Sequence, residues 1–315
     1  MVYPGRRDNP VALMSYAWGC IELEGTDMSD MTVIGLGAMG AAFARTLLAA
    51  GRSVTVWNRT PEKMQPLVAL GAEGASSLGE ALAASPRAIV CILNYQQTTE
   101  LFEQPDVAPL LKDRTIIQLS TGSPREADEG AQWFVERGAY YLDGAILCWP
   151  GHIGTPEGRI LVAGPEAVFQ DCQTDLQHLA GGLRYLGANY RAASTVDLAF
   201  LARTTGIIFG SIHGAHICEV EGVPVSDFTT ILPAGDRAVP LTQAINDGSF
   251  TTISASGASV DVCGSVVIGL QKHARDAGIN SELPDLMCEW IKRAQTAGFG
   301  SEETAAVIKI LRRSG

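Results

Sequence analysis

A glycine-rich turn near the start of the chain restricts the possible folds more than any other feature of the sequence. Residues 32–34 form a short apolar run that predicts a strand, and Gly35, Gly37 and Gly40 follow in the spacing G-x-G-x-x-G. Residues 41–50 then read as a helix that ends before the next glycine. The first two glycines of such a turn let the backbone approach a pyrophosphate, and the third lets the helix lie close to the strand. The turn therefore predicts a dinucleotide site at a helix N-terminus.

A second apolar run, residues 53–57, completes a strand–helix–strand unit and makes the glycine motif more specific. In NAD sites an acidic residue at the end of this strand binds the ribose 2′-hydroxyl. This chain has Asn58, Arg59 and Thr60 there, with Lys63 one turn later. Arg59 and Lys63 would attract a 2′-phosphate that a carboxylate would repel, so the sequence favours NADPH over NADH. The alternative is that both cations are ordinary surface residues.

Length and composition are those of a globular protein with room for two domains. The chain has 315 residues, of which 46% are hydrophobic and 18% are charged. Its net charge of −11 argues against a nucleic-acid partner. No uninterrupted apolar run is long enough to cross a bilayer. Seven cysteines without a C-x-x-C pair are typical of reduced thiols and predict a cytoplasmic protein.

The first 27 residues do not fit the predicted fold. They lack the basic start and apolar centre of a signal peptide. Met28-Ser29-Asp30-Met31, directly before the first strand, resembles a natural start. We expect residues 1–27 to be a mobile extension upstream of the folded chain.

Strand-like and helix-like segments alternate between residues 52 and 187. Apolar runs at 87–93, 114–119 and 140–147 predict strands, and residues 124–137 predict a helix between two of them. Alternation of this kind predicts a mostly parallel sheet covered by helices on both faces. In such sheets ligands bind beyond the carboxyl ends of the strands.

Polar loops follow two of these strands, at residues 94–97 and 120–124. They lie where a ligand of a doubly wound sheet is expected. Asn94 and Ser123 also have the residue types that cap a following helix, and Pro124 suits a first helical turn. Capping and ligand contact are compatible, so both interpretations stand.

Beyond Gly187 helical spacing replaces the strand pattern. Residues 192–220 predict one helix about 40 Å long at 1.5 Å per residue. Gly206, Gly210 and Gly214 recur along it every four residues, although each costs about 1 kcal/mol against alanine. The stripe favours a close helix crossing at a dimer or domain interface; the alternative is a weakness tolerated in a buried helix.

Two further helices are predicted at residues 258–277 and 283–298, each with a glycine at its end. The chain should therefore comprise an N-terminal Rossmann-type doubly wound α/β domain at 28–188 and an all-helical domain at 189–315. The second region includes the long interdomain helix.

Few side chains in the helical region suggest chemistry. His213, His216 and Glu219 share a helix face, but without a third convincing ligand they are more typical of packing than of a metal site. No metal is therefore expected. Asp197, near the start of the long helix, has small or apolar neighbours and should be buried. It is either a carboxylate facing the nicotinamide cleft or a solvated residue that favours the helix dipole.

The chain resembles the NADPH-dependent imine reductases, within the β-hydroxyacid dehydrogenase (3-hydroxyisobutyrate dehydrogenase-like) superfamily and its 6-phosphogluconate dehydrogenase-like fold. The likeness covers residues 30–315. It rests on Gly35-Leu-Gly-Ala-Met-Gly40, Asn58-Arg59-Thr60, Ser120-Thr-Gly-Ser-Pro124, Asp143-Gly-Ala-Ile146 with Ile153-Gly154, and Gly278-Ile279 with Glu282-Leu283-Pro284.

At two places the sequence departs from the hydroxyacid dehydrogenases and is similar to imine reductases. In this chain Asp197 occupies the position of the dehydrogenases' catalytic lysine, and no lysine lies between Lys112 and Lys272. The segment that binds substrate carboxylate in those enzymes is replaced by Cys148-Trp149-Pro150. One group of imine reductases has aspartate at the lysine position.

The physics of C=N reduction favours the same assignment, because hydride attacks an iminium cation more readily than a neutral imine. A carboxylate 4 Å away would stabilise that cation by about 4 kcal/mol at an effective dielectric of 20. Each 1.36 kcal/mol by which the activation free energy falls raises the rate tenfold. Asp197 could also donate the proton if burial raises its pKa, and the sequence does not choose between the two roles.

The resemblance implies further roles. Asn94 would lie near the nicotinamide and orient the substrate, Trp149 and Thr205 would shape the pocket, and Thr205 replaces a tyrosine often found in reductive aminases. The family's dimers exchange their helical domains, so each site would use both chains. The expected cofactor contacts are Gly35, Leu36, Gly37, Ala38, Met39, Gly40, Asn58, Arg59, Thr60, Lys63, Leu93, Asn94, Ser120 and Thr121.

The sequence thus predicts a cytoplasmic, homodimeric, NADPH-dependent reductase of cyclic imines. Two alternatives remain open: a β-hydroxyacid or semialdehyde dehydrogenase with an atypical acid, and a non-catalytic NADPH-binding protein.

Overall fold

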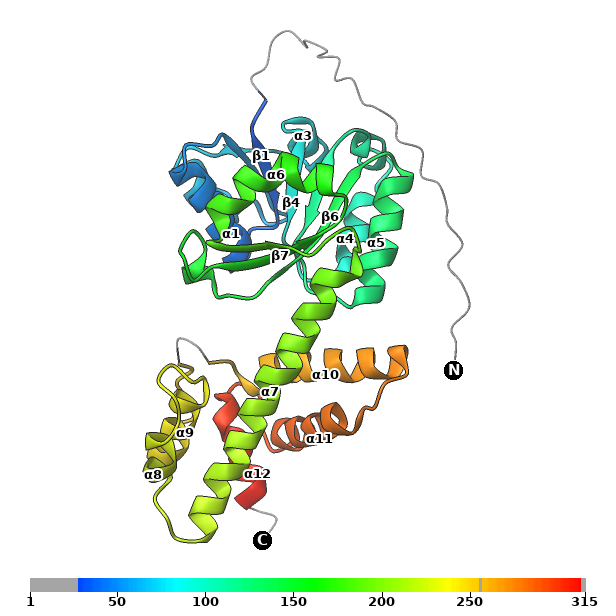
Figure 1. The fold of residues 1–315 in the computed structure, drawn as a ribbon. Coiled ribbons are helices and arrows are strands. Elements are labelled where there is room, and N and C mark those ends of the chain that lie inside the picture. The colour runs from blue at the N-terminus through cyan, green and yellow to red at the C-terminus, as the bar shows by residue number, and fades with distance from the viewer. Residues whose placement is uncertain (1–27, 255–256, 313–315) are drawn as a thin grey trace.

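A computed structural model describes residues 28–254 and 257–312. The extension expected at residues 1–27 lies outside these residues. Figure 1 shows a sheet flanked by helices, from which one long helix leads to a separate group of helices. This is the arrangement predicted from the sequence: a Rossmann-type sheet, a long connecting helix and a helical C-terminal region.

The sheet has eight strands in the order β3-β2-β1-β4-β5-β6-β7-β8. All neighbouring strands are parallel except β6 and β7, which are antiparallel, so the sheet is mostly parallel as expected. The strands are β1 (Met31–Ile34), β2 (Val54–Trp57), β3 (Glu73–Gly74), β4 (Arg87–Val90), β5 (Thr115–Gln118), β6 (Tyr140–Ile146), β7 (Arg159–Ala163) and β8 (Gly182–Tyr185).

Successive strand residues point to opposite faces of the sheet. Apolar side chains therefore lie on both faces, and helices cover both of them. Ile89 of β4 packs in a core with Phe43 of α1 (Ala38–Ala49), and α6 (Glu166–Leu179) contributes to the same core. The next residue, Val90, packs on the other face with Phe102 of α4 (Tyr95–Phe102) and Phe134 of α5 (Pro124–Glu136). α3 (Leu78–Ala83) joins α4 and α5 on that face, so the sheet lies between two helical layers (Figure 1).

Two element ends differ from the sequence prediction by three residues, and several others differ by one or two. α1 begins at Ala38 rather than at residue 41, because the third glycine lies in its first turn. β4 ends at Val90 rather than at residue 93. The backbone amide of Cys91 still donates to Ile34 O at 2.9 Å, and the amide of Ile92 donates to the Ser120 hydroxyl oxygen at 3.2 Å. Residues after Val90 therefore turn into the loops at the sheet edge instead of extending the strand.

The long helix α7 (Arg191–Val220) spans about 45 Å at 1.5 Å per residue. Its first turns contact β6 and α5, and Phe209, Ile212 and Ala215 enter a second apolar core. In residues 28–254 and 257–312, α7 alone has the length and hydropathy of a membrane span, which buried core helices share. Arg203 and His213 lie along its exposed side.

The second core is shared by α7 and the helices that follow it, and it has no strand among the described residues. The elements of this region are α8 (Val225–Thr230), α9 (Ala238–Asp247), α10 (Val260–Ala277), α11 (Glu282–Thr296), η4 (Thr304–Val307) and α12 (Ile308–Arg312). Gly278, the expected terminator of α10, has a left-handed φ of 67°. The remaining short elements are η1 (Pro61–Lys63), α2 (Gln65–Val68), η2 (Ala108–Leu111) and η3 (Pro150–His152).

The glycine stripe of α7 does not cross another part of the described chain. A side chain placed on Gly206 or Gly210 would meet no atom within 4 Å beyond its own helix and chain neighbours. Gly214 alone is near a neighbour, the ring of Phe228, at 3.1 Å. At Gly206 and Gly210 the predicted close helix crossing is therefore absent within residues 28–254 and 257–312, and an interface with a second chain stays a prediction.

Candidate active site

The three glycines of the first turn have three different surroundings. Gly35 has φ of +91°, and a Cβ on it would lie 2.4 Å from the carbonyl oxygen of Cys91. A Cβ on Gly40 would lie 1.8 Å from Gly35 O, so α1 packs directly on the turn. Gly37 would meet nothing within 4 Å, which leaves open space at the N-terminus of α1. A tight turn, a close helix contact and room for a phosphate are what dinucleotide binding requires.

Asn58 fixes the glycine turn to the end of β2. Its Oδ1 accepts a hydrogen bond from the backbone amide of Leu36 at 2.9 Å, and its Nδ2 donates to Thr60 O at 3.0 Å. Arg59, Thr60 and Lys63 are exposed beside it. Two cations thus stand next to the glycine turn, with Glu62 the only acidic residue between them.

The polar loops after β4 and β5 meet at the same sheet edge. Asn94 caps α4 by accepting from the amide of Gln97 at 2.9 Å, and Ser123 forms a capping box with Glu126. Both capping predictions are confirmed. The Ser120 hydroxyl accepts from the amide of Ile92 at 3.2 Å and so joins the two loops. Leu93 is 72% exposed, and Thr121 is also exposed.

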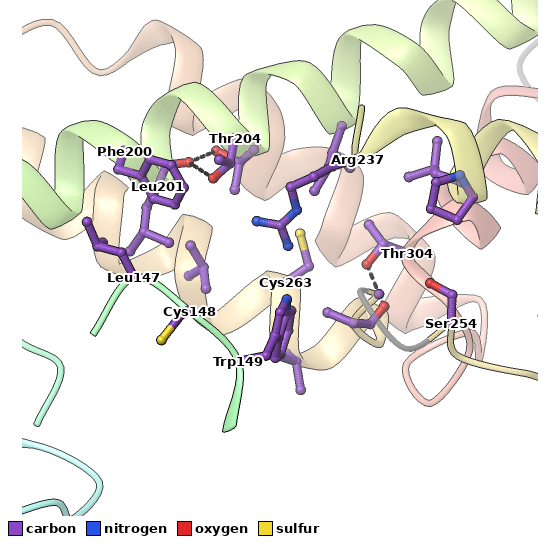
Figure 2. A pocket seen from close by; sticks show the side chains of 18 of the residues that line it. Leu147, Cys148, Trp149, Phe200, Leu201, Thr204, Arg237, Ser254, Cys263 and Thr304 are labelled. Carbon is purple, nitrogen blue, oxygen red and sulfur yellow. Dashed lines mark hydrogen bonds between the residues drawn. The ribbon is translucent and has the colours of Figure 1, made fainter. Parts of the chain in front are cut away.

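A cavity of about 510 Å³ lies beyond the end of β6, where the sheet faces the helical region (Figure 2). The predicted residues Trp149, Asp197 and Thr205 all line it. Asn94, Ser120, Thr121 and the glycines of the turn do not. Since β1, β4, β5 and β6 are parallel, their carboxyl ends meet at one edge, so the cavity opens on the side of the sheet that carries the polar loops.

Asp197 is buried in the wall of this cavity, as its apolar sequence neighbours indicated. It is 7% exposed, and burial raises the pKa of its carboxyl from 3.8 to about 6. Near neutral pH the group therefore exchanges a proton more readily than a surface aspartate. Such a carboxyl can hold a proton for donation or stabilise a cation beside it.

Apolar groups dominate the lining around Asp197. Phe200 and Leu201 follow it on the next turn of α7, and the hydroxyl of Thr205 is engaged because it donates to Leu201 O at 2.8 Å. Arg237 and Trp149 both point into the cavity in Figure 2, and the guanidinium carbon lies 5.9 Å from the ring centroid. The cavity thus offers a large apolar surface with two buried acids, Asp197 and Glu303, and two arginines, Arg159 and Arg237.

Several lining residues were missed by the sequence analysis. Phe200 and Thr204 lie three and seven positions after Asp197, so helical spacing would have placed them on its face. Arg237, Cys263 and Thr304 come from three other elements and had no local signal.

The histidine pair of α7 packs against an aromatic ring and lies beside an acid. His213 is exposed and its ring centroid lies 6.3 Å from that of Trp290. His216 Nδ1 lies 3.7 Å from a carboxylate oxygen of Glu219, which also binds Arg312. Among the described residues no group of three or more His, Cys, Asp or Glu side chains is placed to hold a metal ion.

Known proteins match both halves of the chain. Residues 30–187 match the family described as the NAD binding domain of 6-phosphogluconate dehydrogenase. Residues 189–313 match the NADPH-dependent reductive aminase-like C-terminal domain. An NADPH-dependent reductive aminase from Aspergillus oryzae is 30% identical over 286 residues, which cover 88% of this chain and 95% of that protein.

Solved structures agree with these matches. An imine reductase from Myxococcus stipitatus in complex with NADP+ is 30% identical, with a TM-score of 0.63 over 90% of this chain and 99% of that one. A 3-hydroxyisobutyrate dehydrogenase from Salmonella typhimurium has a TM-score of 0.75 over 90% of this chain and 100% of that one. Its identity is 23%, so it shows the fold alone.

The glycine turn, the mostly parallel sheet and the helical C-terminal region define a two-domain, dinucleotide-binding class of oxidoreductase. Within that class, the chain belongs to the imine reductase and reductive aminase family. The resemblance and the fold class predicted from the sequence are thereby confirmed.

Proposed function

We propose that the protein is an NADPH-dependent imine reductase that transfers hydride to the C=N carbon of cyclic imines or iminium ions and releases amines. The observation that carries this proposal is Asp197, a buried carboxyl in an apolar cavity on the cofactor side of the sheet. Family membership and the names of the relatives support the same reaction.

The residues present fit NADPH. The open space over Gly37 at the N-terminus of α1 suits the pyrophosphate, and the exposed Arg59 and Lys63 suit a 2′-phosphate. Asn58 holds the turn in place by accepting a hydrogen bond from the backbone amide of Leu36. When bound, the cofactor supplies the hydride. The other predicted contacts are Ala38, Met39, Gly40, Thr60, Leu93, Asn94, Ser120 and Thr121.

Asp197 would act on the other reactant. As a carboxylate about 4 Å from an iminium nitrogen it would stabilise the cation by about 4 kcal/mol at an effective dielectric of 20. With a pKa of about 6 it also holds a proton for part of the time at neutral pH, so it can donate one to a neutral imine. The apolar wall formed by Phe200, Leu201 and Trp149 would exclude water from the reacting bond.

We further infer a homodimer with exchanged helical regions, in which the chain divides into domains at residues 28–188 and 189–315. The exposed side of α7 supports this inference. Ile217 and Val220 are 52% and 68% exposed, and the open glycines Gly206 and Gly210 lie on the same helix. An apolar stripe with small residues suits close contact with another helix. The free cysteines of the described residues support a cytoplasmic setting.

The deciding experiment follows NADPH oxidation with cyclic imines, aldehydes and ketones, and NADP+ reduction with β-hydroxyacids. We expect turnover with imines such as 1-pyrrolines, and we expect Asp197→Ala to lose it while NADPH still binds with the same affinity. Turnover on hydroxyacids instead would support a dehydrogenase. NADPH binding without turnover on any substrate would support a non-catalytic binding protein.

A further inference from the structure

A buried hydrogen-bonded trio joins the sheet to the start of α7. The phenol of Tyr95 donates a hydrogen bond to one carboxylate oxygen of Asp143, and the hydroxyl of Ser194 donates to the other at 3.1 Å. Asp143 lies in β6, Tyr95 is the first residue of α4, and Ser194 lies in the first turn of α7. All three side chains are buried.

The trio places a carboxyl group in the protein core, which costs folding free energy. Asp143 is fully buried, and burial raises the pKa of its carboxyl to about 7, although the hydrogen bonds from Tyr95 and Ser194 oppose this rise. A buried carboxyl generally stabilises a fold less than apolar residues of similar shape do. Its benefit is therefore better sought in the geometry that it imposes than in stability.

Two members of the trio lie close in the sequence to residues of the candidate site. Tyr95 directly follows Asn94, the cap of α4. The Tyr95 ring also contacts the loop after β5, because a Cβ on Gly122 would lie 2.3 Å from the ring. Ser194 lies three residues before Asp197 on α7, which is just under one helical turn. Asp143 thus links both polar loops, through Tyr95, to the acid-bearing helix, through Ser194.

We propose that Tyr95, Asp143 and Ser194 are positioning residues that hold the start of α7, and with it Asp197, at a fixed place relative to the Asn94 and Ser120 loops. This inference rests on the proposed function. A hydride transfer depends steeply on the distance between donor and acceptor, and a misplacement of about 1 Å can cost on the order of 100-fold in rate. Loss of the trio should therefore lower kcat more than it weakens cofactor binding.

A second link between α7 and the sheet domain provides a control. Arg191 forms an ion pair with Asp128 of α5 at 2.7 Å, but both side chains are partly exposed. Exposed ion pairs contribute little because water and salt screen them. We expect Asp128→Asn to change kcat by less than about twofold. Tyr140→Phe removes the hydroxyl of an exposed tyrosine and is the matched control for Tyr95→Phe.

The test measures kcat, KM for a cyclic imine and the isotope effect with NADPH deuterated at the transferred position, all per NADPH-binding site. Tyr95→Phe and Ser194→Ala should lower kcat by about tenfold or more and raise the isotope effect, because hydride transfer becomes rate-limiting. NADPH affinity should stay within about twofold. Asp143→Asn should retain most of the activity, since an amide of the same shape can still bond both partners, whereas Asp143→Ala should not.

A loss of kcat in Tyr95→Phe that vanishes when rates are expressed per NADPH-binding site would overturn the inference, since only stability would then be affected. Unchanged kcat and isotope effect would overturn it too. If the wild type reduces no imine, the proposed function fails, and hydrogen exchange decides the positioning role. Amides at the start of α7 should then exchange faster in Tyr95→Phe than in Tyr140→Phe, and equal exchange would contradict the inference.

Discussion

The glycines of the first turn and the glycines of α7 are the same residue in opposite surroundings. Gly35 and Gly40 are so crowded by backbone atoms that no side chain fits on either of them. Gly206 and Gly210 have open space where a side chain would begin. At the glycine turn, atoms of the same chain leave no room for a residue larger than glycine. At Gly206 and Gly210 of α7, nothing in the described chain excludes a larger residue.

This difference is what the proposed dimer would produce, with a cofactor region complete in one chain and a helical region whose exposed side meets a partner. Around the glycine turn, Asn58 and Ser120 each hold a neighbouring loop. Along α7, open glycines accompany the exposed side chains of Ile217 and Val220, which gain nothing from contact with water. The inferred dimer would supply the missing contacts.

The largest effect is expected at Gly40, where the cofactor region is most crowded. Gly40→Ala places a Cβ 1.8 Å from Gly35 O, so α1 must move away from the turn. We expect NADPH affinity to fall by about 100-fold or more, together with the melting temperature, because the phosphate site and the packing are lost at once. Calorimetric titration and thermal unfolding measure the two effects.

Gly37→Ala is the matched variant, because the space at Gly37 is open. It should leave the melting temperature of the cofactor-free protein unchanged and lower NADPH affinity by about tenfold, since the methyl group intrudes on the pyrophosphate. Wild-type NADPH affinity in this variant would mean that the phosphates do not pass over Gly37, and the proposed pyrophosphate site would be wrong.

Asp197→Asn should have the next largest effect, on activity. We expect kcat to fall by about 100-fold, which corresponds to about 2.7 kcal/mol of transition-state stabilisation at 1.36 kcal/mol per tenfold. NADPH affinity should not change, because Asp197 lines the cavity and not the glycine turn. A fall in NADPH affinity equal to the fall in kcat would place Asp197 in the cofactor site instead.

The same variant should make the protein more stable at alkaline pH. Burial raises the pKa of Asp197 from 3.8 to about 6, so the folded state keeps a proton that the unfolded state releases. The wild type thus loses stability as pH rises from about 4 to about 6, by at most about 3 kcal/mol at 1.36 kcal/mol per pH unit. Asp197→Asn should raise the melting temperature at pH 8 but not at pH 4. No difference at pH 8 would mean that water reaches the carboxyl.

The sequence predicted the elements around the glycine turn in detail because their determinants are local. Glycine spacing, apolar runs and the capping residues Asn94 and Ser123 each depend on neighbours only a few positions away. The burial of Asp197 followed from the same kind of pattern. Element ends were less accurate, as at β4, because the point where a strand turns away depends on the loop that it meets.

The trio and several lining residues of the cavity were not predicted, because they depend on contacts between distant positions. Asp143 is 48 residues from Tyr95 and 51 residues from Ser194. Arg237 and Thr304 reach the cavity from separate elements of the helical region. A single sequence contains no periodic signal for such meetings, so only the folded backbone shows which polar residues face one another.

A smaller effect is expected from Arg59, which tests how the cofactor region selects its ligand. Arg59→Ala should lower affinity for NADPH by about tenfold and leave affinity for NADH unchanged, because only NADPH carries a 2′-phosphate. The effect should shrink at high salt, since Arg59 is exposed. Arg184→Ala is the control, because β8 lies at the opposite end of the sheet from β2. Equal losses for both cofactors would mean that Arg59 does not recognise the 2′-phosphate, and no loss for either would make it an ordinary surface residue.

The smallest effect is expected from Gly210, and it tests the helical region most directly. In one chain alone, Gly210→Ala fills open space and should stabilise α7 by about 1 kcal/mol through helix propensity. At a tight crossing with a partner helix the added methyl group would instead weaken the dimer, so that it dissociates at higher protein concentration. Gly269→Ala in α10 is the matched control, since Gly269 is an exposed, open helical glycine as well. Sedimentation and melting temperature over a range of concentrations distinguish the outcomes. If both variants raise the melting temperature alike and dimers persist unchanged, the stripe is not the contact, and the helical region is as complete in one chain as the cofactor region.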